Sequence, residues 1–243
     1  MSKSPVGKSP VDNVDEVDFY LHKLRLRYKK IDPEEYYLSY SGGKDSHLLY
    51  WFQKVYMKGT PIENIPIVGV NTYMEHEEIL KRITDNSDVI LKPKLKPFEI
   101  KEKYGSPCFS KVQDEYISRY QRGSTAPSTL MFVAGDRVSK FKLNKKARKL
   151  LLSGELHKVS NKCCTYLKKK PAEEYIKETG QKPILGLRQD EGMARKAHVS
   201  SCFSKNMVFT PIWDLSDDML QKIIDKYDIE VPPIYKRISR TGL

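Results

Sequence analysis

The alternation of strand-like and helix-like segments is the feature that most restricts the fold of this chain. Short runs rich in β-branched and aromatic residues occur at 36–40, 65–72, 88–91 and 182–187. Apolar residues at helical spacing follow the first two runs, at 47–59 and at 76–84. Strands that alternate with helices at this spacing form βαβ units, in which the strands are parallel and the helices cover both faces of the sheet. The sequence therefore predicts an α/β protein with a parallel sheet.

Three polar motifs come directly after predicted strands. SGGKDS occupies 41–46, NTYME occupies 71–75, and GLRQDEG occupies 186–192. Ligands on parallel sheets bind at the carboxyl ends of the strands. We therefore expect the three motifs to meet at one edge of the sheet and to form a binding site there.

The first motif has the composition of an anion-binding loop. Gly42 and Gly43 let the backbone turn tightly and bring its amides close to a ligand, and the following helix adds its positive end. Lys44 supplies a mobile charge for terminal phosphates, while Ser41 and Ser46 supply hydroxyl groups. The spacing differs from GxxxxGK[ST], so ordinary Walker-type chemistry is not indicated. A glycine turn that only caps a helix is the alternative, and it would leave the charged pair after the glycines unexplained.

Several segments resemble one known family. SGGKDS after a first strand resembles the PP-loop of the ATP pyrophosphatase superfamily, also called adenine nucleotide α-hydrolase-like. CCTYLKKKP at 163–171, GLRQDE at 186–191 with Arg195 beyond it, and TPIW at 210–213 with Asp217 and Asp218 beyond it are similar, in this order, to motifs of phosphoadenylyl-sulfate (PAPS) reductases. The pattern extends from about residue 36 to residue 235. It looks most like the PAPS reductase-like proteins of bacteria and their phages.

The resemblance implies an architecture. We expect a Rossmann-like (HUP-type) parallel sheet of five strands, with helices on both faces and a mainly helical, basic insertion at about 105–170. Residues 1–14 repeat the element KSPV without any hydrophobic period and are interpreted as a flexible tail. The PAPS reductase-like domain would then span residues 15–235, and a C-terminal tail would span residues 236–243.

The resemblance also implies the site residues. The nucleotide phosphates would lie on the PP-loop and the adenine near the end of the second strand. The implied nucleotide-binding residues are Ser41, Gly42, Gly43, Lys44, Asp45, Ser46, Asn71, Thr72, Met74, Glu75, Gly186 and Arg188. The implied catalytic residues are Lys44, Asp45, Arg188 and Arg195. In this interpretation the arginines face the phosphates, where guanidinium donors stabilise developing charge, and Asp45 helps to hold Mg²⁺. A surface role is the alternative for Arg188.

The reaction is predicted from where the chain departs from the reductases. Those enzymes usually lack the PP-loop lysine, because their substrate has no β- and γ-phosphates, and they use a nucleophilic cysteine near the C-terminus. This chain has the full SGGKDS and no cysteine after Cys202. We therefore expect ATP rather than PAPS as the nucleotide, with adenylylation, pyrophosphate release and a link to sulfur transfer from a sulfur donor. The alternatives are a PAPS or APS reductase that forms sulfite with a thioredoxin-like reductant, and a non-catalytic nucleotide-binding module of a larger assembly.

The positive charge of the chain is concentrated in one region. The net charge is +12, and residues 137–170 contain 12 Lys and Arg against a single acid, Glu155. A basic stretch of this density suits a polyanion such as a nucleic acid. A solvated, lysine-rich helix is the alternative interpretation.

The four cysteines are too few for a secreted disulfide framework. Cys163 and Cys164 resemble the adjacent pair that helps to bind a [4Fe–4S] cluster in some relatives, and Cys108 and Cys202 would complete four thiolates. The alternative is that they are ordinary packed residues. The sequence has neither a membrane-spanning apolar run nor a secretory h-region, so we expect a cytoplasmic protein without a membrane partner, in the bacterial host cell if it is phage-encoded.

Overall fold

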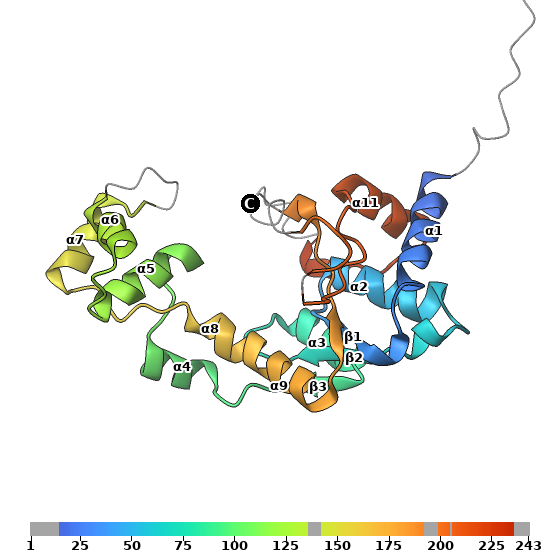
Figure 1. Cartoon of the computed structure of the whole chain (residues 1–243), viewed down its shortest axis with the longest axis horizontal. Coiled ribbons are helices and arrows are strands. Elements are labelled where there is room, and N and C mark those ends of the chain that lie inside the picture. The colour runs from blue at the N-terminus through green and yellow to red at the C-terminus, as the bar shows by residue number, and fades with distance from the viewer. Residues whose placement is uncertain (1–14, 136–141, 192–198, 205, 236–243) are drawn as a thin grey trace, which may run out of the picture. The chain divides into compact units, whose positions relative to one another are not determined.

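The computed structural model describes residues 15–135, 142–191, 199–204 and 206–235 (Figure 1). Its contacts divide the chain into two compact units. Unit 1 consists of Met1–Gly69, Glu77–Val89 and Thr179–Leu243. Unit 2 consists of Val70–His76 and Ile90–Glu178. None of the helices in the described ranges is both long and apolar enough to cross a bilayer.

A parallel sheet is the centre of the α/β fold, as predicted. Its strands are β1 (Tyr36–Tyr40), β2 (Ile67–Val70), β3 (Val89–Leu91) and β4 (Lys182–Ile184). Their order across the sheet is β3-β2-β1-β4, and β1 pairs in parallel with both β2 and β4. Leu38 in β1 lies opposite Ile67 on one side and Ile184 on the other. The sheet therefore has the strand arrangement of a Rossmann-like protein, with β1 and its following loop at the centre.

The sheet has four strands in the described residues, and the prediction of five is wrong. The segment at Phe209 reaches the position beside β4, where its backbone exchanges hydrogen bonds with Leu185 N and Pro183 O at 2.8 and 3.0 Å. The contact stays a single bridge to Ile184. The next amide, that of Thr210, turns away to Cys202 O, and Pro211 has no N–H to continue a ladder.

Helices flank the sheet in unit 1. They are α1 (Glu16–Tyr28), α2 (Lys44–Trp51), which continues as a π-helical turn at Phe52–Tyr56, α3 (Glu77–Asn86) and α11 (Asp217–Lys226). Short 3-10 turns lie at Pro33–Glu35, Pro61–Asn64 and Gln189–Glu191. Buried side chains from α1, β1, α2 and α11 form one core, for example Leu24, Leu38, Leu48 and Ile223. This core fixes the start of α2 relative to the start of α11.

A partly buried ion pair anchors the chain just before α11. Asp214 accepts hydrogen bonds from Arg27 at 2.7 and 2.6 Å, from Tyr20 at 3.0 Å and from Lys23 at 2.5 Å. Burial would raise the pKa of Asp214, but the hydrogen bonds from Arg27 and Lys23 outweigh it and hold that pKa well below its usual range. Since Ser216 caps α11 two residues later, α1 determines where α11 begins.

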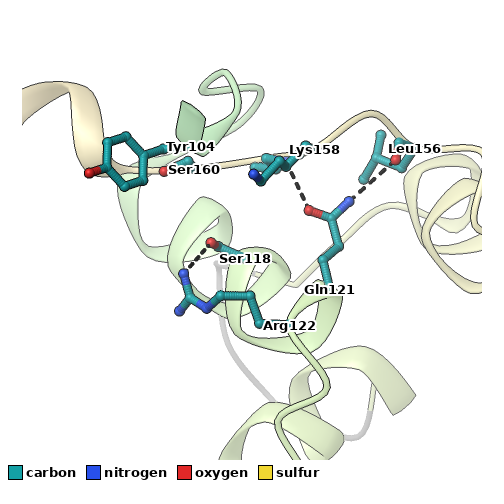
Figure 2. A pocket seen from close by; sticks show the side chains of 8 residues that line it. Tyr104, Ser118, Gln121, Arg122, Leu156, Lys158 and Ser160 are labelled. Atoms are coloured by element: carbon teal, nitrogen blue, oxygen red, sulfur yellow. Dashed lines mark hydrogen bonds between the residues drawn. The ribbon is translucent and has the colours of Figure 1, made fainter. Parts of the chain in front are cut away.

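Unit 2 is mainly helical in its described part, as predicted for 105–170. Its helices are α4 (Pro97–Tyr104), α5 (Lys111–Gln121), α6 (Pro127–Ala134), α7 (Lys145–Ser153), α8 (Lys162–Cys164), the π-helical turn Thr165–Lys169 and α9 (Lys170–Thr179). It has a separate core, formed by Ile117, Phe132, Val133, Leu143, Ala147, Leu151 and Val159. The extended segment 156–160 is held against α5 by Gln121, which donates to Leu156 O and His157 O and accepts from Val159 N (Figure 2).

Candidate nucleotide-binding site

The predicted phosphate loop lies between β1 and α2. Gly42 has a φ of +71°, which an L side chain rarely adopts, and Gly43 is the extended N-cap residue of α2. No side chain caps the first turn of α2. Its positive end, together with the loop amides, is therefore the part of unit 1 best suited to bind an anion.

The two serines of the loop hold its shape. The Ser46 hydroxyl accepts from Ser41 N at 3.2 Å, contacts the Ser41 hydroxyl at 3.0 Å and donates to Gly43 O at 3.1 Å. In this arrangement the hydroxyls bond to the loop itself. Their role in the structure is to position the amides, and a bound ligand would have to rearrange them to take their hydrogen bonds.

Two glycines allow close backbone approaches around the loop. A Cβ on Gly42 would lie 3.0 Å from Ile79 O in α3, and a Cβ on Gly186 would lie 3.0 Å from Ser46 N. The loop after β4 therefore packs directly on the first turn of α2. This contact explains the glycine at 186 independently of any ligand.

Gly42→Ala is expected to destabilise unit 1 more than Gly59→Ala. Both positions have a positive φ, +71° and +79°, but a Cβ on Gly59 has no atom within 4 Å. The left-handed backbone costs alanine about 1–2 kcal/mol at either position. The contact with Ile79 O adds about 1 kcal/mol or more at Gly42 alone. Urea unfolding of the two variants measures the difference, and equal losses would contradict the close approach.

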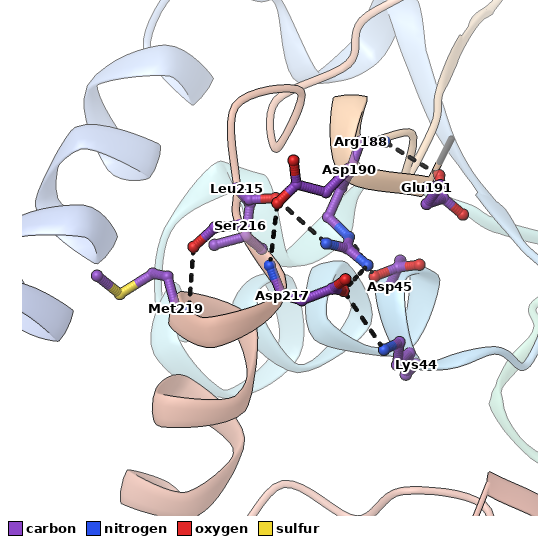
Figure 3. Close-up of polar contacts among 9 residues, drawn as sticks. All are labelled: Lys44, Asp45, Arg188, Asp190, Glu191, Leu215, Ser216, Asp217 and Met219. Carbon is purple, nitrogen blue, oxygen red and sulfur yellow. Dashed lines mark hydrogen bonds and ion pairs between the residues drawn. The ribbon is translucent and has the colours of Figure 1, made fainter. Parts of the chain in front are cut away.

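The guanidinium of Arg188 is buried and bonded to two carboxylates, rather than exposed to solvent (Figure 3). It is only 1% exposed. Its Nε donates to Asp45 Oδ1 at 2.7 Å, one terminal nitrogen donates to Asp217 Oδ1 at 2.8 Å, and the other donates to Leu215 O at 3.2 Å. Burial alone would lower the pKa of Arg188, but the charges of Asp45 and Asp217 outweigh it and raise that pKa. The side chain thus joins the loop after β4 to the first turns of α2 and α11.

Lys44 is a partly exposed cation beside this network. Its Nζ lies 3.7 Å from Asp217 Oδ1, and the two side chains are 35% and 65% exposed. A pair this long and exposed contributes little stability, so a phosphate can replace the carboxylate at Lys44. Hydrogen bonding to Arg188, followed by the charges of Arg188 and Lys44, lowers the pKa of Asp217.

Asp217 is the site residue that the sequence analysis did not assign. Its position after Ser216, in the first turn of a helix, has an ordinary explanation as helix capping. Nothing local in the sequence indicates its pairing with Arg188 and Lys44. The signal that could have found it is the proximity of the α11 start to the strand ends, and this depends on the tertiary fold.

Lys44 also lines a cavity in unit 1. The cavity has a volume of about 620 Å³, within the usual range for small-molecule sites. Its other described lining residues belong to α11 and the segment after it: Gln221, Ile224, Asp225, Asp228, Ile229, Glu230, Val231 and Tyr235. The Tyr235 hydroxyl would lie 3.1 Å from a Cβ on Gly43. Lys44 therefore borders a space large enough for a nucleotide, in which the other described charged lining residues, Asp225, Asp228 and Glu230, are acidic.

The residues expected to bind adenine form their own turn in unit 2. Thr72 donates from its backbone N and its hydroxyl to the Glu75 carboxylate at 2.9 and 2.6 Å, and Tyr73 N donates to Asn71 Oδ1. Met74 is 66% exposed. The PP-loop, Gly186 and Arg188 lie together in unit 1. The predicted adenine-binding residues Asn71, Thr72, Met74 and Glu75 belong to unit 2. Arg195 lies outside the described residues.

The described residues show no iron–sulfur site. No group of three or more Cys, His, Asp or Glu gathers there as a metal site. Cys108 is exposed, and Cys163 and Cys164 are consecutive residues of α8. Cys202 belongs to the other unit. For Mg²⁺, the carboxylates of Asp45 and Asp217 are oxygen donors of a suitable kind, and both also accept hydrogen bonds from Arg188.

His47 is buried below the loop. Its Nδ1 lies 2.9 Å from the Tyr40 hydroxyl, and its ring stacks on Tyr50. Burial, followed by the charge of Arg82, lowers its pKa to about 4. His47 is therefore neutral near pH 7 and is unsuited to proton transfer at that pH.

The low pKa of His47 predicts a loss of stability in acid. Between its usual value of 6.5 and about 4 the unfolded chain binds a proton that the folded chain does not, so stability falls as pH falls through this window. The loss between pH 7.5 and pH 5 should be roughly 2 kcal/mol. His47→Gln should remove this part of the pH dependence, which urea unfolding of both proteins at the two pH values measures. The same dependence in both proteins would contradict the assignment.

A comparison with known families identifies the C-terminal part of the sequence. The family model described as the phosphoadenosine phosphosulfate reductase domain matches residues 136–241. Residues 136–241 are therefore PAPS reductase-like. The matched range is somewhat under half of the chain and contains the segments at 163–171, 186–191 and 210–213, whereas the PP-loop lies before it.

Comparisons with individual proteins give weaker evidence than the family model. No curated protein matches the sequence significantly. The solved structure of PAPS reductase from Candida auris, in a phosphate complex, is similar with a TM-score of 0.47 and 12% identity, over 96% of this chain and 94% of that one. NH3-dependent NAD synthetase from Campylobacter jejuni, in complex with nitrate, is similar with a TM-score of 0.40 and 14% identity, over 92% of this chain and 76% of that one. Both TM-scores are too low to support an inference about function.

Proposed function

We propose that this protein binds ATP on the PP-loop and promotes attack on its α-phosphate with release of pyrophosphate. The observation that supports this most is the position of Lys44. It is a partly exposed cation at the uncapped start of α2, on the wall of a cavity of about 620 Å³. A lysine at this point suits a ligand with phosphates beyond the α-position.

Each residue of the site has a role in this proposal. The amides around Gly42 and Gly43 hold the phosphates, and Lys44 binds the terminal ones. A nucleophile of the acceptor attacks the α-phosphorus, the bond to the bridging oxygen breaks, and pyrophosphate leaves with the bonding electron pair. Arg188 acts as a positioning residue, because its buried guanidinium holds the carboxylates of Asp45 and Asp217, which would supply oxygen ligands for Mg²⁺. Arg195 would stabilise the charge on the leaving pyrophosphate.

The proposal also includes an adenine pocket and an acceptor. The adenine would contact the turn formed by Asn71, Thr72, Met74 and Glu75. The basic stretch 137–170 supports a nucleic acid as the acceptor. A sulfur donor would then displace AMP from the adenylylated acceptor, in keeping with the sulfur chemistry in the name of the matched family.

The match to PAPS reductases favours a second candidate, reduction of a sulfonucleotide to sulfite. Cys202 is the last cysteine of the sequence and is partly exposed, so it is the thiol to consider as nucleophile. The Cys202 thiolate would attack the sulfonyl sulfur and displace the adenosine phosphate, which leaves an S-sulfocysteine. A thiol of a thioredoxin-like reductant would then attack the cysteine sulfur, release sulfite and form a mixed disulfide that its second thiol resolves.

Parallel turnover assays separate the two reactions. The full chain is incubated with Mg-ATP, a single-stranded oligonucleotide and sulfide, and separately with PAPS and a thiol reductant. We expect pyrophosphate from the first mixture and no sulfite from the second. Sulfite release that Cys202→Ser abolishes would replace the proposed reaction with the second candidate. If neither product forms, the proposal fails and the result favours a non-catalytic nucleotide-binding module.

A further inference from the structure

Unit 2 contains a second cavity that no sequence motif indicated (Figure 2). Its volume is about 380 Å³. Its described lining residues come from the end of α4, the second half of α5 and the segment 156–160: Tyr104, Ser118, Gln121, Arg122, Leu156, Lys158, Val159 and Ser160. Ser118, Val159 and Ser160 are buried, whereas Arg122 and Lys158 are exposed. The cavity thus has a buried interior and two exposed cations.

The wall of this cavity is held from two sides. Gln121 fixes the segment 156–160 through its three hydrogen bonds from α5. On the other side Ser106 N donates to Lys158 O at 2.9 Å, and Ser160 N donates to Ser106 O at 3.1 Å. A Cβ on Gly105 would lie 2.1 Å from Lys158 O, so only glycine allows this approach. The cavity is therefore a fixed feature of unit 2.

The charges around the cavity select an anion. None of its described lining residues is acidic. Among the described residues neither Arg122 nor Lys158 pairs with a carboxylate. Arg122 donates to the Ser118 hydroxyl at 3.0 Å, and Lys158 donates to Lys103 O at 2.7 Å. Unit 2 as a whole contains 21 Lys and Arg against 10 Asp and Glu, a net charge of +11, so almost all of the excess charge of the chain belongs to it.

Tyr104, Leu156 and Val159 form the aromatic and apolar part of the lining, beside the polar Ser118, Gln121 and Ser160. Tyr104 stacks on Tyr166, with ring centroids 4.6 Å apart, and Lys170 Nζ lies 4.3 Å from the centre of the Tyr166 ring. Leu156 and Val159 add aliphatic surface. A flat apolar surface beside cations suits a nucleobase joined to phosphates, and stacking of bases on aromatic rings among cations is how proteins bind single-stranded nucleic acids.

We propose that this cavity binds one nucleotide of a single-stranded nucleic acid. The base lies against Tyr104 and Leu156, Arg122 and Lys158 bind the adjoining phosphates, and the lysine-rich helices of unit 2 contact the phosphates on either side. A duplex does not fit, because its bases are stacked and paired and cannot enter the cavity. The inference rests on the proposed function only in taking a nucleic acid as the acceptor.

Binding of a fluorescent oligonucleotide of about 12 nucleotides tests this site, measured by anisotropy with the full chain and without ATP. Failure of the ATP chemistry therefore cannot affect the result. Arg122→Gln, Lys158→Gln and Tyr104→Leu should each lower the affinity about tenfold at about 0.1 M salt. The first two variants should also reduce the slope of log affinity against log salt concentration by about one each, because each loses one phosphate contact. DNA and RNA oligonucleotides are compared to identify the sugar.

Lys111→Gln is the matched control, because it removes an exposed charge from the opposite end of α5. We expect it to change the affinity less than about twofold. Equal losses in Lys111→Gln and the cavity variants would overturn the proposal, since only general charge would then matter. So would wild-type affinity in the cavity variants, equal binding of a duplex, or no binding by the wild-type chain. Thermal unfolding of each variant confirms that a loss of binding is not a loss of folding.

Discussion

Replacing Lys44 by alanine is expected to lower the affinity for Mg-ATP about tenfold to hundredfold, the range for losing a hydrogen bond to a charged group. The affinity for AMP should change by less than about twofold, because Lys44 is proposed to bind the terminal phosphates that AMP lacks. In the unliganded protein the lysine pairs only weakly with Asp217, at 3.7 Å, so little stability is lost with it. The difference between the two nucleotides is the specific signature of this role.

Calorimetric titration of both nucleotides into wild type and variant measures this difference. Lys58→Ala is the matched control, because Lys58 is an exposed lysine beyond the other end of the same helix and its π-helical turn. It should leave both affinities unchanged. An equal loss of AMP and ATP affinity in Lys44→Ala would mean that the lysine only shapes the loop. Unchanged ATP affinity would place the triphosphate elsewhere.

Replacing Arg188 by alanine is expected to lower the free energy of unfolding by about 3 kcal/mol. The guanidinium is almost completely buried, and its removal leaves Asp45, whose side chain is 15% exposed, without its buried partner. It also leaves Leu215 O without this donor and opens a cavity between β4 and the two helix starts. Asp217 is 65% exposed and therefore adds little to the loss.

Urea unfolding measures the Arg188 effect. Lys81→Ala is the control, since it breaks an exposed pair with Asp85 in the same unit and should cost less than about 1 kcal/mol. Asp45→Asn combined with Arg188→Ala should lose less than the sum of the single changes, because the remaining buried charge is then removed. A loss in Arg188→Ala as small as that in Lys81→Ala would contradict the buried network, and an additive double variant would do the same.

Local patterns predicted the strands of this fold well. The structure has β1 at the predicted residues, and β2, β3 and β4 lie within the predicted runs, because short β-branched and aromatic segments between helical ones have few other interpretations. The phosphate loop was predicted equally well. Two glycines between a strand and a helix indicate a tight turn, and Gly42 has the positive φ of such a turn. These features depend on neighbours in the sequence.

Features that depend on tertiary contacts were not predictable. The guanidinium of Arg188 is bonded to acids that are 143 and 29 residues away in the sequence, and the sequence analysis did not predict these pairs. The expected fifth strand is only a single bridge at Phe209, because the backbone N–H of the next residue, Thr210, donates to Cys202 O instead of to β4. The cavity around Gln121 and Lys158 joins segments about 40 residues apart, with no motif at either position.

Thermal unfolding of the full chain with and without Mg-ATP tests the central claim, that the PP-loop site binds a triphosphate. At about a hundred times the dissociation constant, ATP should add about 2.7 kcal/mol to the stability of the folded protein. AMP and PAPS at the same concentration should add clearly less. Stabilisation by PAPS with none by ATP would contradict the account and favour sulfonucleotide reduction. No stabilisation by any of the three nucleotides would contradict nucleotide binding at this site.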